Sequence, residues 1–138
     1  MTALRFLDTN ILLYSISTDR AEVAKRECAI NLLERDDIGL SVQVLGEFYV
    51  QATRPTRRDA LTHEIAAGLI EAWLRFPVQD LTRQIVLDAL ALKAAHGFSY
   101  WDSAIIAAAA ALGCRELYTE DLTHGRDVHG VRIIDPFR

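Results

Sequence analysis

Apolar and polar positions follow two patterns along this chain, and together they predict short strands separated by helices. The predicted strands are short apolar runs at residues 4–7, 38–40, 77–81, 116–118 and 131–134. The predicted helices repeat apolar residues at helical spacing, one of them starting near residue 11 and the others spanning residues 22–35, 42–53, 62–76, 82–96 and 99–113. Strands that alternate with helices in this order favour an α/β fold with a mainly parallel sheet and helices on both faces.

Boundary residues support these elements. Side chains that cap helix N-termini precede three of the helices, at Ser41, Thr82 and Ser99. Gly97 is placed to end the helix before it in a left-handed conformation. The polar run at residues 54–59 predicts a loop, and residues 122–130 are interpreted as an irregular polar segment.

Composition narrows the class of protein. With 138 residues, 51% of them hydrophobic, the chain is expected to form one domain over residues 1–138 around a single core. The net charge of −4 argues against a protein that coats nucleic acid through bulk positive charge. The longest apolar run, residues 104–114, is about half of a membrane span, and no signal peptide is visible, so we expect a cytoplasmic protein. The spacing of Cys28 and Cys114 suggests neither a zinc site nor a disulfide framework.

The first strand ends in Asp8-Thr9-Asn10, directly before the apolar start of a helix. In open α/β sheets, ligands bind at the carboxyl ends of strands, so Asp8 is a candidate functional residue. The alternative is that one of the three residues simply caps the helix.

Three further acids are candidates, each with a structural alternative. Glu47 lies between Gln43 and Gln51 on a helical stripe that a solvated face also explains. Asp102 is the fourth residue of a possible capping box opened by Ser99, although Trp101 before it and the apolar helix after it indicate that it enters the core layer. Asp121 follows an apolar strand, where it could be an ordinary turn residue; its neighbour Glu120 is a weaker candidate.

A parallel sheet would bring the aspartates after two strands, Asp8 and Asp121, to one edge. Carboxylates gathered there would repel one another and raise each other's pKa unless a cation neutralised them. An oxygen-only set suits Mg²⁺ or Mn²⁺, and zinc is disfavoured because the turns that carry Asp8 and Asp102 contain no histidine.

Four motifs in this order resemble the PIN-domain family, and more closely its VapC-type toxin ribonucleases, the nuclease halves of bacterial toxin–antitoxin pairs. The motifs are Leu7-Asp8-Thr9-Asn10, Glu47-Phe48 in the helix after Ser41, Tyr100-Trp101-Asp102-Ser103-Ala104-Ile105, and Thr119-Glu120-Asp121. Each motif alone is weak, but the ordered set is specific, and the similarity extends over the whole chain.

The resemblance implies a mainly parallel five-strand sheet flanked by helices, with four acids in one pocket around Mg²⁺ or Mn²⁺. Asp8 and Asp102 would be the most direct metal ligands, and Glu47 and Asp121 would complete the pocket. Thr9 and Asn10 would orient the carboxylates and bound water. The activity implied is hydrolysis of an RNA phosphodiester by metal-activated water, restrained by a cognate antitoxin protein.

An acidic pocket repels RNA, so basic residues at its rim would have to steer the substrate. Arg54, Arg57 and Arg58 form the densest basic cluster, in the loop after the Glu47 helix, although a merely solvated loop explains them equally well. The resemblance also implies a homodimer or antitoxin surface on the helices at residues 22–35 and 42–53, for which Ile30, Leu33 and Tyr49 are weak candidates.

Other functional classes share parts of this pattern. A haloacid-dehalogenase-like phosphotransfer domain also opens with an aspartate after its first strand, but it normally carries a second aspartate where Asn10 stands. A response-regulator receiver lacks support because its acidic pair and late lysine are missing. A catalytically silent PIN-like interaction module is the non-enzymatic alternative, and the complete set of four acids argues against it.

Overall fold

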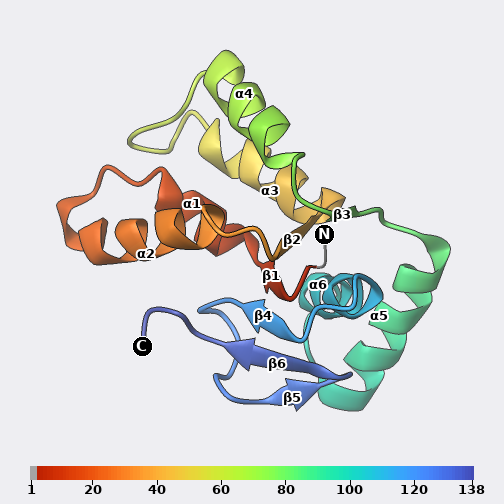
Figure 1. The fold of residues 1–138 in the computed structure, drawn as a ribbon. Coiled ribbons are helices and arrows are strands. Elements are labelled where there is room, and N and C mark those ends of the chain that lie inside the picture. Colours follow the sequence, from red (N-terminus) through yellow and green to blue (C-terminus); the bar gives the residue numbers. More distant parts are fainter. Residues whose placement is uncertain (1–2) are drawn as a thin grey trace.

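The computed structural model describes residues 3–138 and contains a six-stranded sheet in the order β3-β2-β1-β4-β6-β5 (Figure 1). The strands are β1 (Arg5–Leu7), β2 (Ile38–Ser41), β3 (Val78–Gln79), β4 (Glu116–Tyr118), β5 (Asp127–Val128) and β6 (Val131–Ile134). All neighbouring strands pair in parallel except β5 and β6. The predicted α/β class with a mainly parallel sheet is confirmed.

The predicted number of five strands is wrong, because part of the segment interpreted as irregular forms β5. Asp127 and Val128 pair antiparallel with Arg132 and Val131 across a two-residue connection. Both residues of that connection are left-handed, His129 at φ 54° and Gly130 at φ 81°. This geometry matches the right-handed twist of a tight hairpin. A strand of two residues is too short to show a hydrophobic period, so the pattern gave no sign of it.

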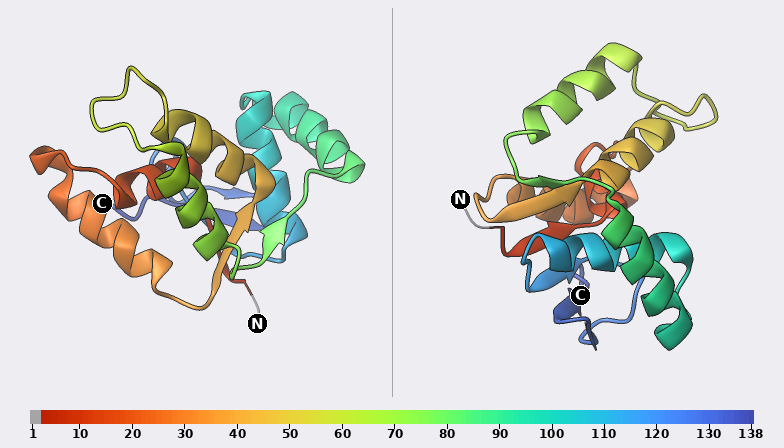
Figure 2. Two further views of the ribbon diagram at one scale, coloured as in Figure 1. Left: turned by 90° about the horizontal axis from the view of Figure 1, so that it is seen from above. Right: turned by 90° about the vertical axis from the view of Figure 1, so that its right-hand side faces the viewer.

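The helices lie on both faces of the sheet. They are α1 (Thr9–Ser15), α2 (Val23–Leu33), α3 (Val42–Ala52), α4 (His63–Trp73), α5 (Arg83–His96) and α6 (Tyr100–Ala111), with a short 3₁₀ segment at Arg20–Glu22. Figures 1 and 2 show α1 and α2 on one side of the sheet and the α5–α6 pair on the other. The α3–α4 pair continues beyond the β2–β3 edge at the top of Figure 1.

The predicted helix boundaries are confirmed at their caps. The Ser41, Thr82 and Ser99 hydroxyls each accept a hydrogen bond from the backbone N–H three residues further on. Gly97 follows α5 in the left-handed conformation, at φ 77°. These caps fix where α3 and α6 begin, and α3 and α6 carry Glu47 and Asp102.

The core lies between the sheet and the helices that cover it. Phe6 and Leu7 of β1 and Leu117 of β4 are fully buried, as are most residues of α6 from Ser103 to Ala109. Gly39 in β2 lies in close packing, because a Cβ there would lie 2.9 Å from Leu112 Cδ1 and 3.0 Å from Ala3 Cβ. Within residues 3–138, we find no helix with the length and apolar character of a membrane span.

Candidate active site

Asp8 lies where β1 ends and α1 begins. It is the N-cap of α1, and its Oδ1 accepts a hydrogen bond from the backbone N–H of Thr9 at 2.7 Å. Its Oδ2 accepts a second hydrogen bond, from the Thr119 hydroxyl at 2.8 Å. Only 5% of Asp8 is exposed. Asp8 therefore caps a helix and also presents a rigidly held carboxylate, so the two interpretations of this residue are compatible.

The pKa of Asp8 lies far above the usual value for an aspartate. Burial, with smaller contributions from the carboxylates of Asp121 and Asp102, raises the pKa of Asp8 from 3.8 to about 7. The hydrogen bonds from Thr119 and Thr9 oppose that rise because they stabilise the charged form. Positive charge beside Asp8 would favour its ionised form near neutral pH.

Thr119 connects the ends of β1 and β4. These strands are parallel neighbours, and the backbone N–H of Asp8 donates to the carbonyl of Tyr118 at 3.0 Å. The fully buried Thr119 hydroxyl also accepts hydrogen bonds from Asn10 Nδ2 and from the backbone N–H of Asp121, both at 3.1 Å. Sequence reasoning gave Thr119 no role, although it belongs to one of the four motifs. The sequence feature that indicates a site role for Thr119 is its position directly after a predicted strand.

Asn10 joins this network and holds Asp121. Its Nδ2 donates to Asp121 Oδ2 at 2.9 Å. Its Oδ1 is buried and has no hydrogen-bond partner among the described residues. The Asp121 side chain is more exposed than that of Asp8, so the two strand-end aspartates differ in how strongly water solvates them.

Glu47 and Asp102 reach the same region from α3 and α6. Glu47 is half-buried, and its Oε1 accepts from Gln43 Nε2 at 3.1 Å and from the Thr9 hydroxyl at 3.4 Å. Asp102 lies in the first turn of α6 and is also half-buried. Because Asp102 is only half-buried, the expectation that it enters the core layer is wrong, and Trp101 beside it is 56% exposed. The α6 residues from Ser103 onward enter the core instead.

One small pocket of about 140 Å³ brings the four acids together. Its lining consists of Asp8, Thr9, Asn10, Leu13, Glu47, Gln51, Trp101, Asp102, Ile105 and Asp121. The pocket contains all four predicted acids and both predicted supporting residues, and no basic residue belongs to its lining. Carboxylates in such a setting call for a neutralising cation.

The donor set of this pocket fits a hard divalent cation. It offers carboxylate oxygens together with the buried, unpartnered Asn10 Oδ1, and Mg²⁺ and Mn²⁺ prefer oxygen ligands. In residues 3–138, however, no three His, Cys, Asp or Glu side chains already converge as a metal site. The acids of residues 3–138 that line the pocket therefore do so as separate groups.

Glu120 has a different role from its neighbour Asp121. Its carboxylate accepts a hydrogen bond from the Tyr14 hydroxyl and pairs with Lys25 Nζ at 2.9 Å. The Lys25 ammonium also lies over the rings of Tyr14 and Phe137. Glu120 does not line the acidic pocket, so its contacts tie the end of β4 to α1 and α2.

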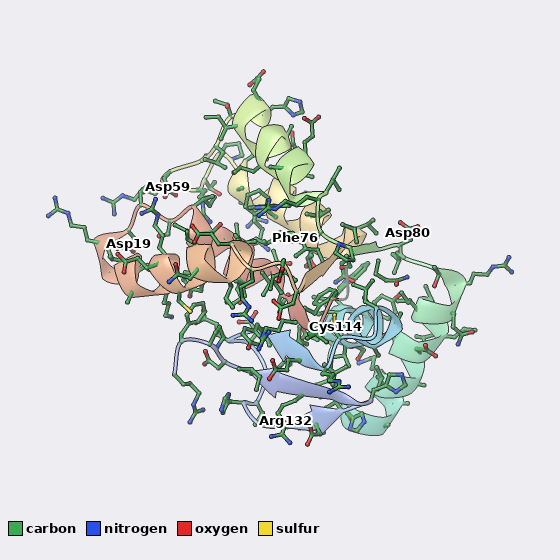
Figure 3. All side chains as sticks on the ribbon, in the orientation of Figure 1. Asp19, Asp59, Phe76, Asp80, Cys114 and Arg132 are labelled. Atoms are coloured by element: carbon green, nitrogen blue, oxygen red, sulfur yellow. The ribbon has the colours of Figure 1, made fainter. Side chains whose placement is uncertain are left out.

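The three arginines of the α3–α4 loop line two different cavities. Arg54 lines a groove that adjoins the acidic pocket. Arg57 and Arg58 line a different cavity, whose other charged residues include the acids Asp19 and Asp59 labelled in Figure 3. Arg57 Nε lies 3.2 Å from Asp59 Oδ1. Arg54 is therefore the arginine of this cluster that lies beside the acids.

Two of the predicted partner-surface residues have structural roles. Leu33 is only 7% exposed and belongs to the core, so its interpretation as a surface residue is wrong. Tyr49 is half-buried, and its hydroxyl lies 2.9 Å from His63 Nδ1, which joins α3 to α4. Ile30 is half-buried on α2.

This fold and its acidic pocket agree with a comparison against known families. A family model described as PIN domain matches residues 5–126. The chain belongs to the PIN-domain family. A comparison with curated proteins finds no match.

Solved structures similar to this chain include proteins of bacterial toxin–antitoxin systems. A toxin–antitoxin complex from Klebsiella pneumoniae is 20% identical with a TM-score of 0.69, and the match covers 96% of this chain and 97% of that one. DNA-bound VapBC from Salmonella typhimurium is 21% identical with a TM-score of 0.66, covering 98% and 99%. VapC20 from Mycobacterium tuberculosis, a sarcin–ricin-loop-cleaving toxin, is 22% identical with a TM-score of 0.64, covering 85% and 91%. At these identities the likeness establishes the shared fold.

Proposed function

We propose that this protein is a metal-dependent endoribonuclease and the toxin of a type II toxin–antitoxin system. The observation that carries the proposal is the pocket where Asp8, Glu47, Asp102 and Asp121 meet at the carboxyl edge of the parallel sheet. Membership of the PIN-domain family and likeness to toxin–antitoxin structures, including an RNA-loop-cleaving toxin, support the same activity.

We assign Asp8 and Asp102 as the residues that would hold Mg²⁺ or Mn²⁺ most directly, with Glu47 and Asp121 completing the set. When bound, the cation supplies positive charge beside the scissile phosphate and makes water a better nucleophile near neutral pH. The proposed chemistry needs no protein nucleophile.

The surrounding residues keep these carboxylates in place. Thr9 and Thr119 donate to the two oxygens of Asp8, and Asn10 donates to Asp121. Gln43 donates to Glu47 from one turn earlier on α3. These bonds fix the orientation of the carboxylates, so the pocket is ordered before a substrate arrives.

Partners follow from the proposed function. The similar structures include a toxin–antitoxin complex from Klebsiella pneumoniae and DNA-bound VapBC proteins from Salmonella typhimurium and Rickettsia felis. For this chain we propose an antitoxin protein that restrains the nuclease, and a homodimer as its own assembly.

The test is RNA cleavage by purified protein in Mg²⁺ with Asp8→Asn and Asp102→Asn variants. We expect each variant to lose roughly 100-fold or more of the rate while keeping its circular dichroism spectrum. Glu120→Gln is the matched control, because Glu120 adjoins Asp121 in sequence but lies outside the pocket lining. Undiminished cleavage by both aspartate variants would reject the site.

Two measurements separate the alternatives. A phosphotransfer domain would be trapped by beryllofluoride on Asp8, whereas a nuclease would not react. An interaction module would take up no Mg²⁺ or Mn²⁺ in a calorimetric titration, whereas the proposed nuclease binds the ion and loses that binding in Asp8→Asn.

A further inference from the structure

A second and larger cavity lies directly against the acidic pocket. It is a groove of about 560 Å³, within the range of about 300–1,000 Å³ typical of sites for small organic ligands. Glu47, Gln51 and Trp101 line both the groove and the acidic pocket. A ligand bound in the groove therefore continues directly into the site of the proposed reaction.

The floor of the groove is one face of α3. Val42, Gly46 and Val50 follow one another at four-residue spacing and all three are exposed, so they form a single apolar stripe along the helix. Gly46 keeps the middle of this stripe flat. A Cβ at Gly46 would meet nothing within 4 Å, so the fold leaves open space above it.

Trp101 and Leu81 add exposed apolar surface to the groove. They are 56% and 45% exposed. The Tyr100 ring meets the Trp101 ring edge-on at 5.0 Å, and the Trp101 carbonyl accepts a hydrogen bond from Gln43 Nε2 at 3.2 Å. These contacts tie the first turn of α6 to α3, so the indole is anchored while much of its surface stays open.

The polar residues of the groove match a nucleotide. Gln51 offers an amide group that can bond a base edge, and Gln43 offers its amide oxygen, because its Nε2 already donates to Glu47 and to the Trp101 carbonyl. Arg54 supplies a cation suited to a phosphate. Single-stranded nucleic acid is commonly held by an exposed aromatic ring that stacks on a base, next to positive charge that follows the backbone. An indole, two amides and one arginine beside a phosphodiesterase pocket form that combination.

We infer that this groove is a nucleotide subsite, in which one base of single-stranded RNA next to the cleaved phosphate stacks on Trp101 above Gly46. The inference rests on the proposed function and specifies it further: the substrate is unpaired at this base. A base held in a duplex already stacks on its neighbours and is unavailable to the indole.

The test measures RNA binding without cleavage. Unstructured ten-nucleotide oligouridylate and oligoadenylate are added to the protein in EDTA at low salt, and tryptophan emission and anisotropy of end-labelled RNA are recorded. The chain has two tryptophans, and Trp73 is only 4% exposed, so quenching by RNA reports on Trp101. We expect quenching in the wild type, and Trp101→Phe should abolish quenching but retain binding.

Two variants challenge the subsite in different ways. Trp101→Ala removes the stacking surface and should weaken binding roughly 5- to 100-fold. Gly46→Leu fills the groove and should weaken binding similarly, without lowering the melting temperature, because leucine favours a helix more than glycine does. Gly68→Leu in α4 is the matched control. Gly68 is also an open helical glycine, but it does not line the groove, so RNA binding should be unchanged.

An abasic nucleotide placed at each position of the RNA identifies the stacked base. At one RNA position, the abasic nucleotide should weaken binding to the wild type as much as Trp101→Ala does. The abasic nucleotide at that same position should not weaken binding to Trp101→Ala any further. Wild-type affinity in both Trp101→Ala and Gly46→Leu would overturn the subsite, as would the absence of RNA-dependent quenching in the wild type.

A protein occupant would give a different result. If a second copy covered the groove, tryptophan emission would shift to the blue with protein concentration in the absence of RNA, and Gly46→Leu would favour the monomer. That result overturns the nucleotide assignment.

Failure of the nucleotide subsite can also be told apart from failure of the nuclease proposal. Cleavage that depends on Asp8 but not on Trp101 rejects only the subsite, whereas Trp101-dependent binding without any cleavage rejects only the nuclease.

Discussion

The Thr119 hydroxyl donates a 2.8 Å hydrogen bond to Asp8 Oδ2, joining the end of β4 to the end of β1. The two residues are 111 positions apart in sequence, and parallel pairing of their strands brings them together. This bond lowers the pKa of Asp8 against the larger effect of burial, which raises it. Thr119 therefore favours ionisation of Asp8 and partly offsets the effect of burial.

Thr119→Val should weaken Mg²⁺ binding by roughly 10- to 100-fold, as loss of a partner that orients a metal ligand commonly does. Because the lost bond stabilises the Asp8 anion, the pH at which cleavage is half-maximal should also move upward. Thr119→Ser restores the hydroxyl and should restore both properties. The measurement is a metal titration together with a pH–rate profile. A lower rate with an unchanged profile and affinity would contradict the assigned role.

The raised pKa of Asp8 predicts a pH-dependent stability in the metal-free protein. The folded-state pKa is about 7 against 3.8 for the unfolded chain, so the stabilising contribution is fully present below pH 3.8 and is lost as pH rises through 7. Relative to Asp8→Asn, the wild type should lose roughly 2–3 kcal/mol of unfolding free energy between pH 5 and pH 8. Urea unfolding in EDTA measures this difference. An equal difference at both pH values would contradict the prediction.

The same shift predicts that Mg²⁺ displaces a proton when it binds. Near neutral pH, a fraction of Asp8 is protonated, and a metal ligand has to be ionised. We therefore expect Mg²⁺ affinity to rise between pH 6 and pH 8 and the binding heat to depend on the ionisation enthalpy of the buffer. Affinity that is constant over this range would be inconsistent with Asp8 as a direct ligand.

Substitution by alanine should change the stability of the fold in opposite directions at Gly39 and Gly68. A Cβ at Gly39 would lie 2.9 Å from Leu112 Cδ1 and 3.0 Å from Ala3 Cβ, so Gly39→Ala should destabilise the fold by about 1–3 kcal/mol. Gly68 lies inside α4 with open space around it, and Gly68→Ala should stabilise by about 0.5–1 kcal/mol. Thermal or urea unfolding of both variants checks the pair.

Arg54 should contribute more to RNA binding than the other two arginines of its loop. Arg54→Ala is expected to weaken binding and to reduce the slope of log affinity against log salt by about 1, because one phosphate contact is lost. Arg57 and Arg58 share their cavity with acidic residues, so the double alanine variant should have the smaller effect. A larger effect of the double variant would place the RNA path over that cavity instead.

Much of the fold follows from local patterns. Phe6 and Leu7 of β1 are buried apolar residues, and α3, α5 and α6 start at hydroxyl side chains whose capping chemistry is evident in the sequence. The end of α5 is likewise marked by Gly97. The β5–β6 hairpin was missed because its stability depends on two left-handed residues, His129 and Gly130, rather than on a hydrophobic period. Leu33 was assigned to the surface because an amphipathic pattern does not specify how wide the buried face of a helix is.

The sequence predicts the acids of the candidate site better than it predicts the residues around them. Asp8 and Asp121 follow neighbouring parallel strands, and their proximity follows from topology. Glu47 was ambiguous, because a polar stripe on α3 is compatible both with solvent and with a pocket. Thr119 and Trp101 acquire their roles only from tertiary contacts. Residue type alone does not tell whether a threonine is buried or a tryptophan is exposed, as these two are.

The most direct test of the central claim is to map the 5′ ends of cellular RNA after the protein is produced without an antitoxin, beside the Asp8→Asn variant at equal abundance. The account predicts a discrete set of new RNA ends with the wild type that is absent with Asp8→Asn. The same new ends in both strains, or no new ends in either, would contradict it.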